Sequence, residues 1–150
     1  MEHPSFSLDT VPTWVTACAY CRVDKMFPFL AQITERDTQE MQALPKEMRG
    51  ADFIFERERV GDAVSAFRVR RVEDMRAAGL VVFEPTRQAI EITTHQWENG
   101  QIRKTPVLAT LAWDPTTHTC LLEIDHQTYT PGAAVEHLLK PIFFPDPETR

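Results

Sequence analysis

The sequence predicts an α+β domain, in which a mostly antiparallel sheet of five to seven strands is accompanied by two or three helices. Two observations favour this class. Short β-rich runs are separated by tight-turn pairs such as Gly61-Asp62 and Asn99-Gly100, which predicts hairpins. The longer helical patterns lie towards the two ends of the chain, so the alternation of strands and long helices typical of a doubly wound parallel sheet is missing.

Length and composition predict one domain over residues 1–150, with loosely held tails at about 1–10 and 145–150. Apolar residues make up 43% of the chain and charged residues 25%, so a domain of this size can build its own core. The net charge is 16 − 22 = −6, which argues against non-specific DNA binding without excluding a local basic patch.

The first elements are one ambiguous segment and one helix. Both faces of the segment 13–23 are largely apolar, so it fits a buried strand or a buried helix. Its Val, Thr, Trp and Tyr content favours a strand. Residues 29–44 carry a broken apolar stripe at helical spacing, and Pro45 is expected to end that helix.

Residues 52–72 are predicted to form a hairpin around Gly61-Asp62, followed by a short helix at 73–79 that Gly79 closes. Residues 75–82, followed by a short hairpin, resemble the end of a winged-helix domain, where a helix ends in Ala-Gly-Leu-Val and runs into the wing. The resemblance covers about twenty residues, and an ordinary glycine-capped helix explains the same pattern.

The second half of the chain predicts strands and one final helix. Strands are expected at 80–83, around Ile90 and Ile92, at 107–113 and at 120–124. A helix is expected near 131–140, because Thr130 is a suitable N-cap and Pro131 suits the first helical position. Pro141 is expected to end it.

Arginines and phenylalanines of the 52–72 hairpin form the first candidate site. If Val60 pairs with Ala63, residues whose numbers sum to 123 lie opposite each other and share a face. One face then carries Phe53, Phe55, Arg57 and Arg59 beside Val64, Ala66, Arg68 and Arg70. Such a face suits an acidic protein partner or single-stranded nucleic acid, whereas a solvated sheet face is the alternative without a function. Trp97, beside the Asn99-Gly100 turn, is expected to be an exposed contact residue.

The three cysteines, Cys18, Cys21 and Cys120, are too few for a disulfide framework and are expected to be reduced thiols in a cytosol. Cys18 and Cys21 form a CxxC, which His118 and Cys120 would complete to a zinc site. A redox CxxC would need its first cysteine at the start of a helix, but this pair lies in an apolar run without a cap residue. Buried structural cysteines are therefore expected, with no metal and no cofactor.

A late cluster of histidines offers the alternative of catalysis. His118, His126 and His137 occur beside Asp125 and Glu136, and a histidine next to a carboxylate can serve as a general acid or base. No nucleophile motif accompanies them, and the five glycines form neither a phosphate loop nor a dinucleotide fingerprint. These observations favour a binding protein over an enzyme and leave the enzyme open as an alternative.

Together these features predict a small cytoplasmic protein-binding module of the inhibitor, immunity or adaptor type, from a bacterium or a phage. Its expected contacts are Arg57, Arg59, Arg68, Arg70, Phe53, Phe55 and Trp97. The alternatives are a nucleic-acid-binding protein that uses the same face and a small enzyme with a late histidine–carboxylate pocket. The chain has neither a basic, apolar leader nor a run of about 18 apolar residues, so no membrane is expected. Homo-oligomerisation stays open.

Overall fold

The computed structural model describes residues 13–145, without the side chain of Glu98. The predicted tail at 1–10, and nearly all of the one at 145–150, lie outside the described residues. The helices are α1 (Trp14–Ala19), α2 (Val23–Ala43), α3 (Lys46–Arg49) and α4 (Pro131–Phe143). The strands are β1 (Asp52–Val60), β2 (Ala63–Glu73), β3 (Arg76–Pro85), β4 (Ile90–Glu98), β5 (Gln101–Asp114), β6 (Thr119–Ile124) and β7 (Gln127–Tyr129). The predicted α+β class is confirmed, and α1 and α3 are short helices beyond the number expected.

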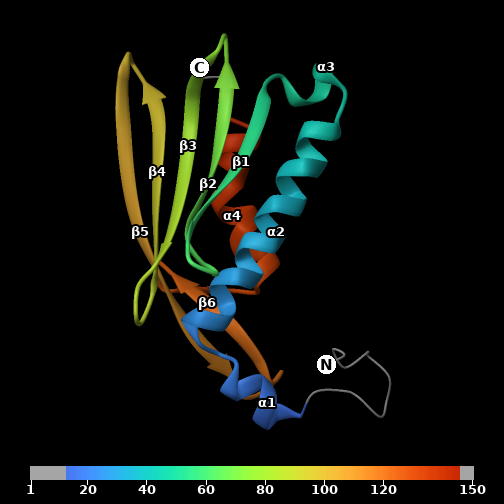
Figure 1. Cartoon of the computed structure of the whole chain (residues 1–150), viewed down its shortest axis with the longest axis vertical. Helices are drawn as coiled ribbons and strands as arrows, with labels where there is room; N and C mark the ends of the chain where they lie inside the picture. Colours follow the sequence, from blue (N-terminus) through green and yellow to red (C-terminus); the bar gives the residue numbers. More distant parts are fainter. Residues whose placement is uncertain (1–12, 146–150) are drawn as a thin grey trace.

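The seven strands form one antiparallel sheet in which every strand pairs with its neighbours in sequence (Figure 1). The long strand β5 pairs with β4 through its first part and with β6 from Thr110 onward. It therefore connects the long strands β1–β4 to the short strands β6 and β7 at one end of the molecule (Figure 1).

Both long helices cover the same face of this sheet, which we call the inner face (Figure 1). The core lies between these helices and the sheet and is centred on Phe67 of β2. The centre of the Phe67 ring is 5.0 Å from that of Phe27 on α2 and 4.4 Å from that of Phe83 on β3. We call the opposite side the outer face, and no helix among residues 13–145 packs on it.

The segment 73–79 is not a helix, so that prediction and the winged-helix resemblance built on it are wrong. Asp74 and Met75 both have positive φ angles, of 50° and 65°, and form the turn that joins β2 to β3. Gly79 is a strand residue, and a Cβ built on it would lie 3.1 Å from Ile142 of α4. A seven-residue helix has little stability of its own, so pairing between the strands prevails.

The strand favoured for residues 13–23 is also wrong, because the segment contains α1 and the start of α2. The side chain of Thr13 caps α1 by accepting a hydrogen bond from the Thr16 amide at 3.3 Å. Helix α2 begins at Val23 instead of residue 29 and includes Pro28. It ends at Ala43, just before Pro45, close to the predicted end.

The final helix is confirmed at its start and corrected at its end. Thr130 is the N-cap of α4 and accepts a hydrogen bond from the Ala133 amide at 3.3 Å, with Pro131 in the first turn. The helix continues through Pro141 to Phe143 and does not stop at the proline. Ile142 and Phe143 are buried there, so packing of this last turn on the sheet supports the extension.

Cys21 and Cys120 form a disulfide, which corrects the expectation of three reduced thiols. The bond joins the segment between α1 and α2 to β6, across 99 residues of sequence. Cys18 remains a free, half-buried thiol. Because Cys21 and Cys120 bond to each other, the suggested zinc ligand set does not form.

Candidate functional site

A β-bulge in the first hairpin changes the predicted register. Val60 pairs with Ala63 as expected, but the register shifts between Glu58 and Arg59, so that Glu58 pairs with Ala66. From there on, paired residue numbers sum to 124, and Arg57 lies opposite Phe67. The predicted register is therefore wrong for most of the hairpin. A one-residue slip of this kind moves the side chains of one strand to the other face relative to its partner.

The bulge divides the predicted arginine–phenylalanine face between the two sides of the sheet. Phe53 and Phe55 pack in the helix-covered core, and Arg57 reaches Glu35 of α2 with an Nη2–Oε2 distance of 3.0 Å. Arg59 lines a cleft together with Arg57. The other four predicted residues of β2 separate likewise: Val64 packs on the inner side, whereas Ala66, Arg68 and Arg70 pair with outer-face positions of β1.

On the outer face, Arg68 and Arg70 share one carboxylate. Glu56 lies 2.8 Å from Nη2 of Arg68 and 2.6 Å from Nη2 of Arg70. The hydrogen bond from Arg68, with the positive charges of both guanidinium groups, holds the pKa of Glu56 below its ordinary value. The cluster keeps a net positive charge at neutral pH, because two cations meet one anion.

The same face carries an acidic pair and several exposed apolar side chains. Glu84 of β3 lies directly opposite Glu91 of β4, and both are exposed. Like charges in this arrangement repel each other. The exposed apolar residues of this face are Ile54, Trp97, Ile102 and Leu108, which are 38–57% exposed. Trp97 lies opposite Ile102, two residues along each strand from the pair formed by His95 and Lys104.

A cleft of about 1060 Å³ lies at the start of α2 and is lined also by the β1–β2 turn, the β3–β4 loop and β5. Four of its lining residues are arginines: Arg22, Arg57, Arg59 and Arg87. We call it the arginine cleft. Local sequence could not reveal it, because its cations come from separate segments that meet only in the folded chain.

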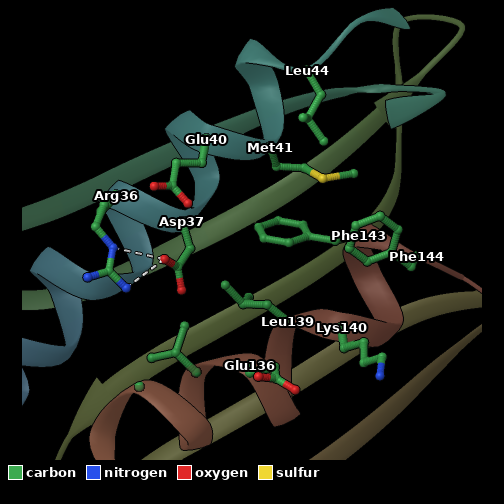
Figure 2. A pocket seen from close by; sticks show the side chains of 12 residues that line it. Arg36, Asp37, Glu40, Met41, Leu44, Glu136, Leu139, Lys140, Phe143 and Phe144 are labelled. Carbon is green, nitrogen blue, oxygen red and sulfur yellow. Dashed lines mark hydrogen bonds and ion pairs between the residues drawn. The ribbon is translucent and has the colours of Figure 1, made fainter. Parts of the chain in front are cut away.

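A second, smaller cavity of about 640 Å³ lies between α2 and α4 (Figure 2). Met41 of α2 and Leu44, just after its end, face Leu139 and Phe143 of α4 across it, and charged side chains border it (Figure 2). Among these, Arg36 donates two hydrogen bonds to Asp37, at 3.0 and 2.9 Å. The groove is an apolar surface with charged margins.

The three late histidines do not form one pocket. His118 lies in the β5–β6 turn and stacks on Trp113, His126 lies in the β6–β7 turn, and His137 on α4 stacks on Tyr129. All three are exposed. The pKa of Asp114 is lowered mainly by a hydrogen bond from the Thr117 hydroxyl, and nearby His118 makes a smaller contribution in the same direction. Asp125 and Glu136, the predicted carboxylate neighbours, are also exposed.

Comparisons of the chain with protein-family models, with curated proteins and with solved structures found no significant match.

Proposed function

We propose that this chain is a protein-binding module of the inhibitor, immunity or adaptor type, and that its interface is the outer face of the sheet. The observation that supports this most is that both long helices lie on the inner face, which leaves the outer face uncovered among the described residues. Tryptophan and arginine are the side chains most enriched among interface hot spots, and Trp97, Arg68 and Arg70 lie on this face.

The charges of the outer face indicate the chemistry of the partner. Arg68 and Arg70 retain one positive charge after pairing with Glu56, so a partner carboxylate is favoured there. Glu84 and Glu91 repel each other across adjacent strands, and a lysine or arginine of the partner would relieve that repulsion. The proposed partner is therefore a folded protein that presents an acidic and a basic side chain on either side of an apolar contact.

Two earlier alternatives lose their geometric basis. The nucleic-acid hypothesis required four arginines on one face, but Arg57 and Arg59 lie on the other side of the sheet from Arg68 and Arg70. The enzyme hypothesis required a histidine pocket, and the three histidines are exposed in separate turns and on α4.

Site-specific crosslinking tests this interface. A photoreactive amino acid at Thr93, in the middle of the outer face, is compared with one at Gln39, an exposed position on α2. We expect one protein of the source cell to crosslink from position 93 but not from position 39, with nuclease making no difference. Trp97→Ala should reduce this product at least tenfold, as truncating a hot-spot residue does. The matched control is Trp14→Ala, which alters a similarly exposed tryptophan on α1.

Three results would contradict the proposal. Equal products from positions 93 and 39 would show that the outer face is not selective. Loss of the product after nuclease treatment would favour nucleic acid instead. Crosslinking only to a second copy of this chain would make the outer face a homo-oligomer contact.

The proposed compartment is the cytoplasm. Within residues 13–145, no helix has both the length and the apolar character needed to cross a membrane. In a reducing compartment the Cys21–Cys120 pair is expected to be kept as thiols. Alkylation of thiols in intact cells, followed by mass spectrometry, tests this: modified Cys21 and Cys120 support the cytoplasm, whereas an intact disulfide favours an oxidising compartment.

A further inference from the structure

The arginine cleft has more positive charge than the chain itself neutralises. Of its four arginines, Arg22 pairs with Asp24, at 3.0 Å, and Arg57 pairs with Glu35, at 3.0 Å. Arg59 and Arg87 are exposed and form no hydrogen bond or ion pair with any residue in the range 13–145. Asp62 also lines the cleft, so its four arginines meet three carboxylates, Asp24, Glu35 and Asp62, and one positive charge remains although the whole chain carries −6.

The Arg57 guanidinium is fixed in place but incompletely satisfied. Glu35 accepts a hydrogen bond from its Nη2, and its Cζ lies 5.5 Å from the centre of the Phe55 ring. Its Nε is buried and has no hydrogen-bond partner. The ion pair with Glu35 and the contact with Phe55 hold this guanidinium at the cleft, where Arg57 is one of the lining residues.

The position of Arg87 is also set by local structure. The loop between β3 and β4 is closed by a hydrogen bond from the Thr86 amide to the Ala89 carbonyl, at 2.8 Å. The Ala89 amide in turn donates to the Thr86 hydroxyl, at 3.1 Å. This closed turn fixes the loop that carries Arg87, which lines the cleft together with Arg57 and Arg59.

Apolar side chains complete the lining beneath these cations. Phe27 and Val23 come from the first turns of α2, Val64 comes from β2 and Leu111 from β5. The volume, about 1060 Å³, is at the upper end of the range of small-molecule sites in proteins. An apolar floor with a few convergent charged groups is the usual composition of such sites.

The start of α2 adds a second feature that favours anions. Helix α2 has 21 residues, and its N-cap residue, Arg22, makes no side-chain capping hydrogen bond. The first amides of a helix and its dipole attract negative charge. Asp24 in the first turn of α2 partly neutralises the positive end of the helix dipole. The helix therefore adds a weaker attraction for anions to that of the arginines.

From these observations we propose that the arginine cleft binds an alkyl anion, a small molecule with one carboxylate or phosphate head and a short apolar chain. The head meets the exposed guanidinium groups of Arg59 and Arg87. The apolar chain lies against Phe27, Val64 and Leu111. This site is separate from the outer face, so it can be tested independently of the proposed function.

The test compares octanoate, octyl phosphate and uncharged octanol as probes, by isothermal titration calorimetry and NMR on the intact protein. We expect at least one anion to bind at least ten times more tightly than octanol, because the uncharged hydroxyl of octanol cannot form the charged hydrogen bonds that a carboxylate or phosphate forms with arginine. The Nε–H resonance of Arg57 should shift on binding. Tighter binding of octanoate than octyl phosphate, or the reverse, identifies the head group.

The double variant Arg59→Gln/Arg87→Gln should weaken binding of the anion at least tenfold, while Arg59→Lys/Arg87→Lys retains part of the affinity. Both arginines are exposed and without partners among residues 13–145, so the variants are expected to fold, which thermal melting checks. The matched control, Arg76→Gln/Lys104→Gln, removes the same charge outside the cleft and should change affinity less than twofold.

Equal binding of octanol and the anions would overturn the proposal, as would saturable binding that the Arg59→Gln/Arg87→Gln variant leaves unchanged. Absence of binding by both anions at millimolar concentration would also overturn it. Trp97→Ala, which alters the outer face, should leave octanoate binding unchanged.

Discussion

Removal of the Cys21–Cys120 disulfide should destabilise the fold strongly, because this bond closes a long loop. The two residues are separated by 99 positions. In the chain-entropy treatment, a cross-link closing a loop of about 100 residues stabilises the native state by about 4.7 kcal/mol at 25 °C. Residual structure in the unfolded chain lowers that value, and disulfides typically contribute about 2–4 kcal/mol. We therefore expect Cys21→Ser/Cys120→Ser to lose about 2–4 kcal/mol of unfolding free energy.

Urea unfolding followed by circular dichroism measures this change. A loss of that size is a large fraction of the roughly 5–15 kcal/mol by which a domain is stable. In thermal melting it corresponds to a fall of about 2–4 °C per kcal/mol at this chain length. Reduction of the wild-type protein should reproduce most of the effect, and Cys18→Ser is the control because Cys18 is outside the bond.

The reasoning would be refuted if the double serine variant lost less than about 1 kcal/mol while the wild-type disulfide was intact by mass spectrometry. That result would mean that the unfolded chain already holds the two segments together, or that the native state gains little from their connection. A loss produced equally by Cys18→Ser would show that the effect belongs to local packing around α1.

Three further predictions concern the core, one ion pair and one helix cap. Phe67→Ala should cost about 3–5 kcal/mol in urea unfolding, because the ring packs against those of Phe27, Phe55 and Phe83; Phe67→Leu, which keeps most of the volume, should cost clearly less. Glu56 has a lowered pKa in the folded state, so its pairing stabilises the fold above its ordinary pKa of 4.5 and is lost as the pH falls through the folded value. The stability difference between wild type and Glu56→Gln should therefore shrink as urea unfolding is repeated from pH 7 down to pH 3, and a constant difference would contradict the pairing. Thr130→Ala should cost about 1 kcal/mol, because it removes the N-cap of α4; Thr128→Ala, on an exposed strand position, is its control.

Much of the fold was accessible from local sequence. The turn pairs Gly61-Asp62 and Asn99-Gly100 were identified because glycine and asparagine adopt positive φ angles that tight hairpins need, and both turns form. Thr130-Pro131 identified the start of α4 for a similar reason: the cap and the proline act within one turn of helix. These signals work because the interactions involved join residues close together in the chain.

The candidate site was predicted less well than the fold, and a one-residue bulge in the first hairpin is the main cause. The bulge at Glu58 and Arg59 shifts the pairing of the rest of the hairpin, so Arg57 meets Glu35 of α2 while Arg68 meets Glu56. The composition of the hairpin is the same in either register. The packing of Phe55 and Phe67 under α2 favours the register observed, and that contact is not encoded within the hairpin.

By itself, the sequence determined the class of the fold, its antiparallel hairpins and the helix after residue 130, because period-two alternation, turn residues and caps are local properties. Three features depend on contacts between distant segments: which face of the sheet is covered, which arginines share a surface, and the bond between Cys21 and Cys120 across 99 residues. The same holds for the arginine cleft, whose four arginines come from three separate segments. Such arrangements depend on the packing of α2 and α4 against the whole sheet, and no short stretch of the chain carries that information.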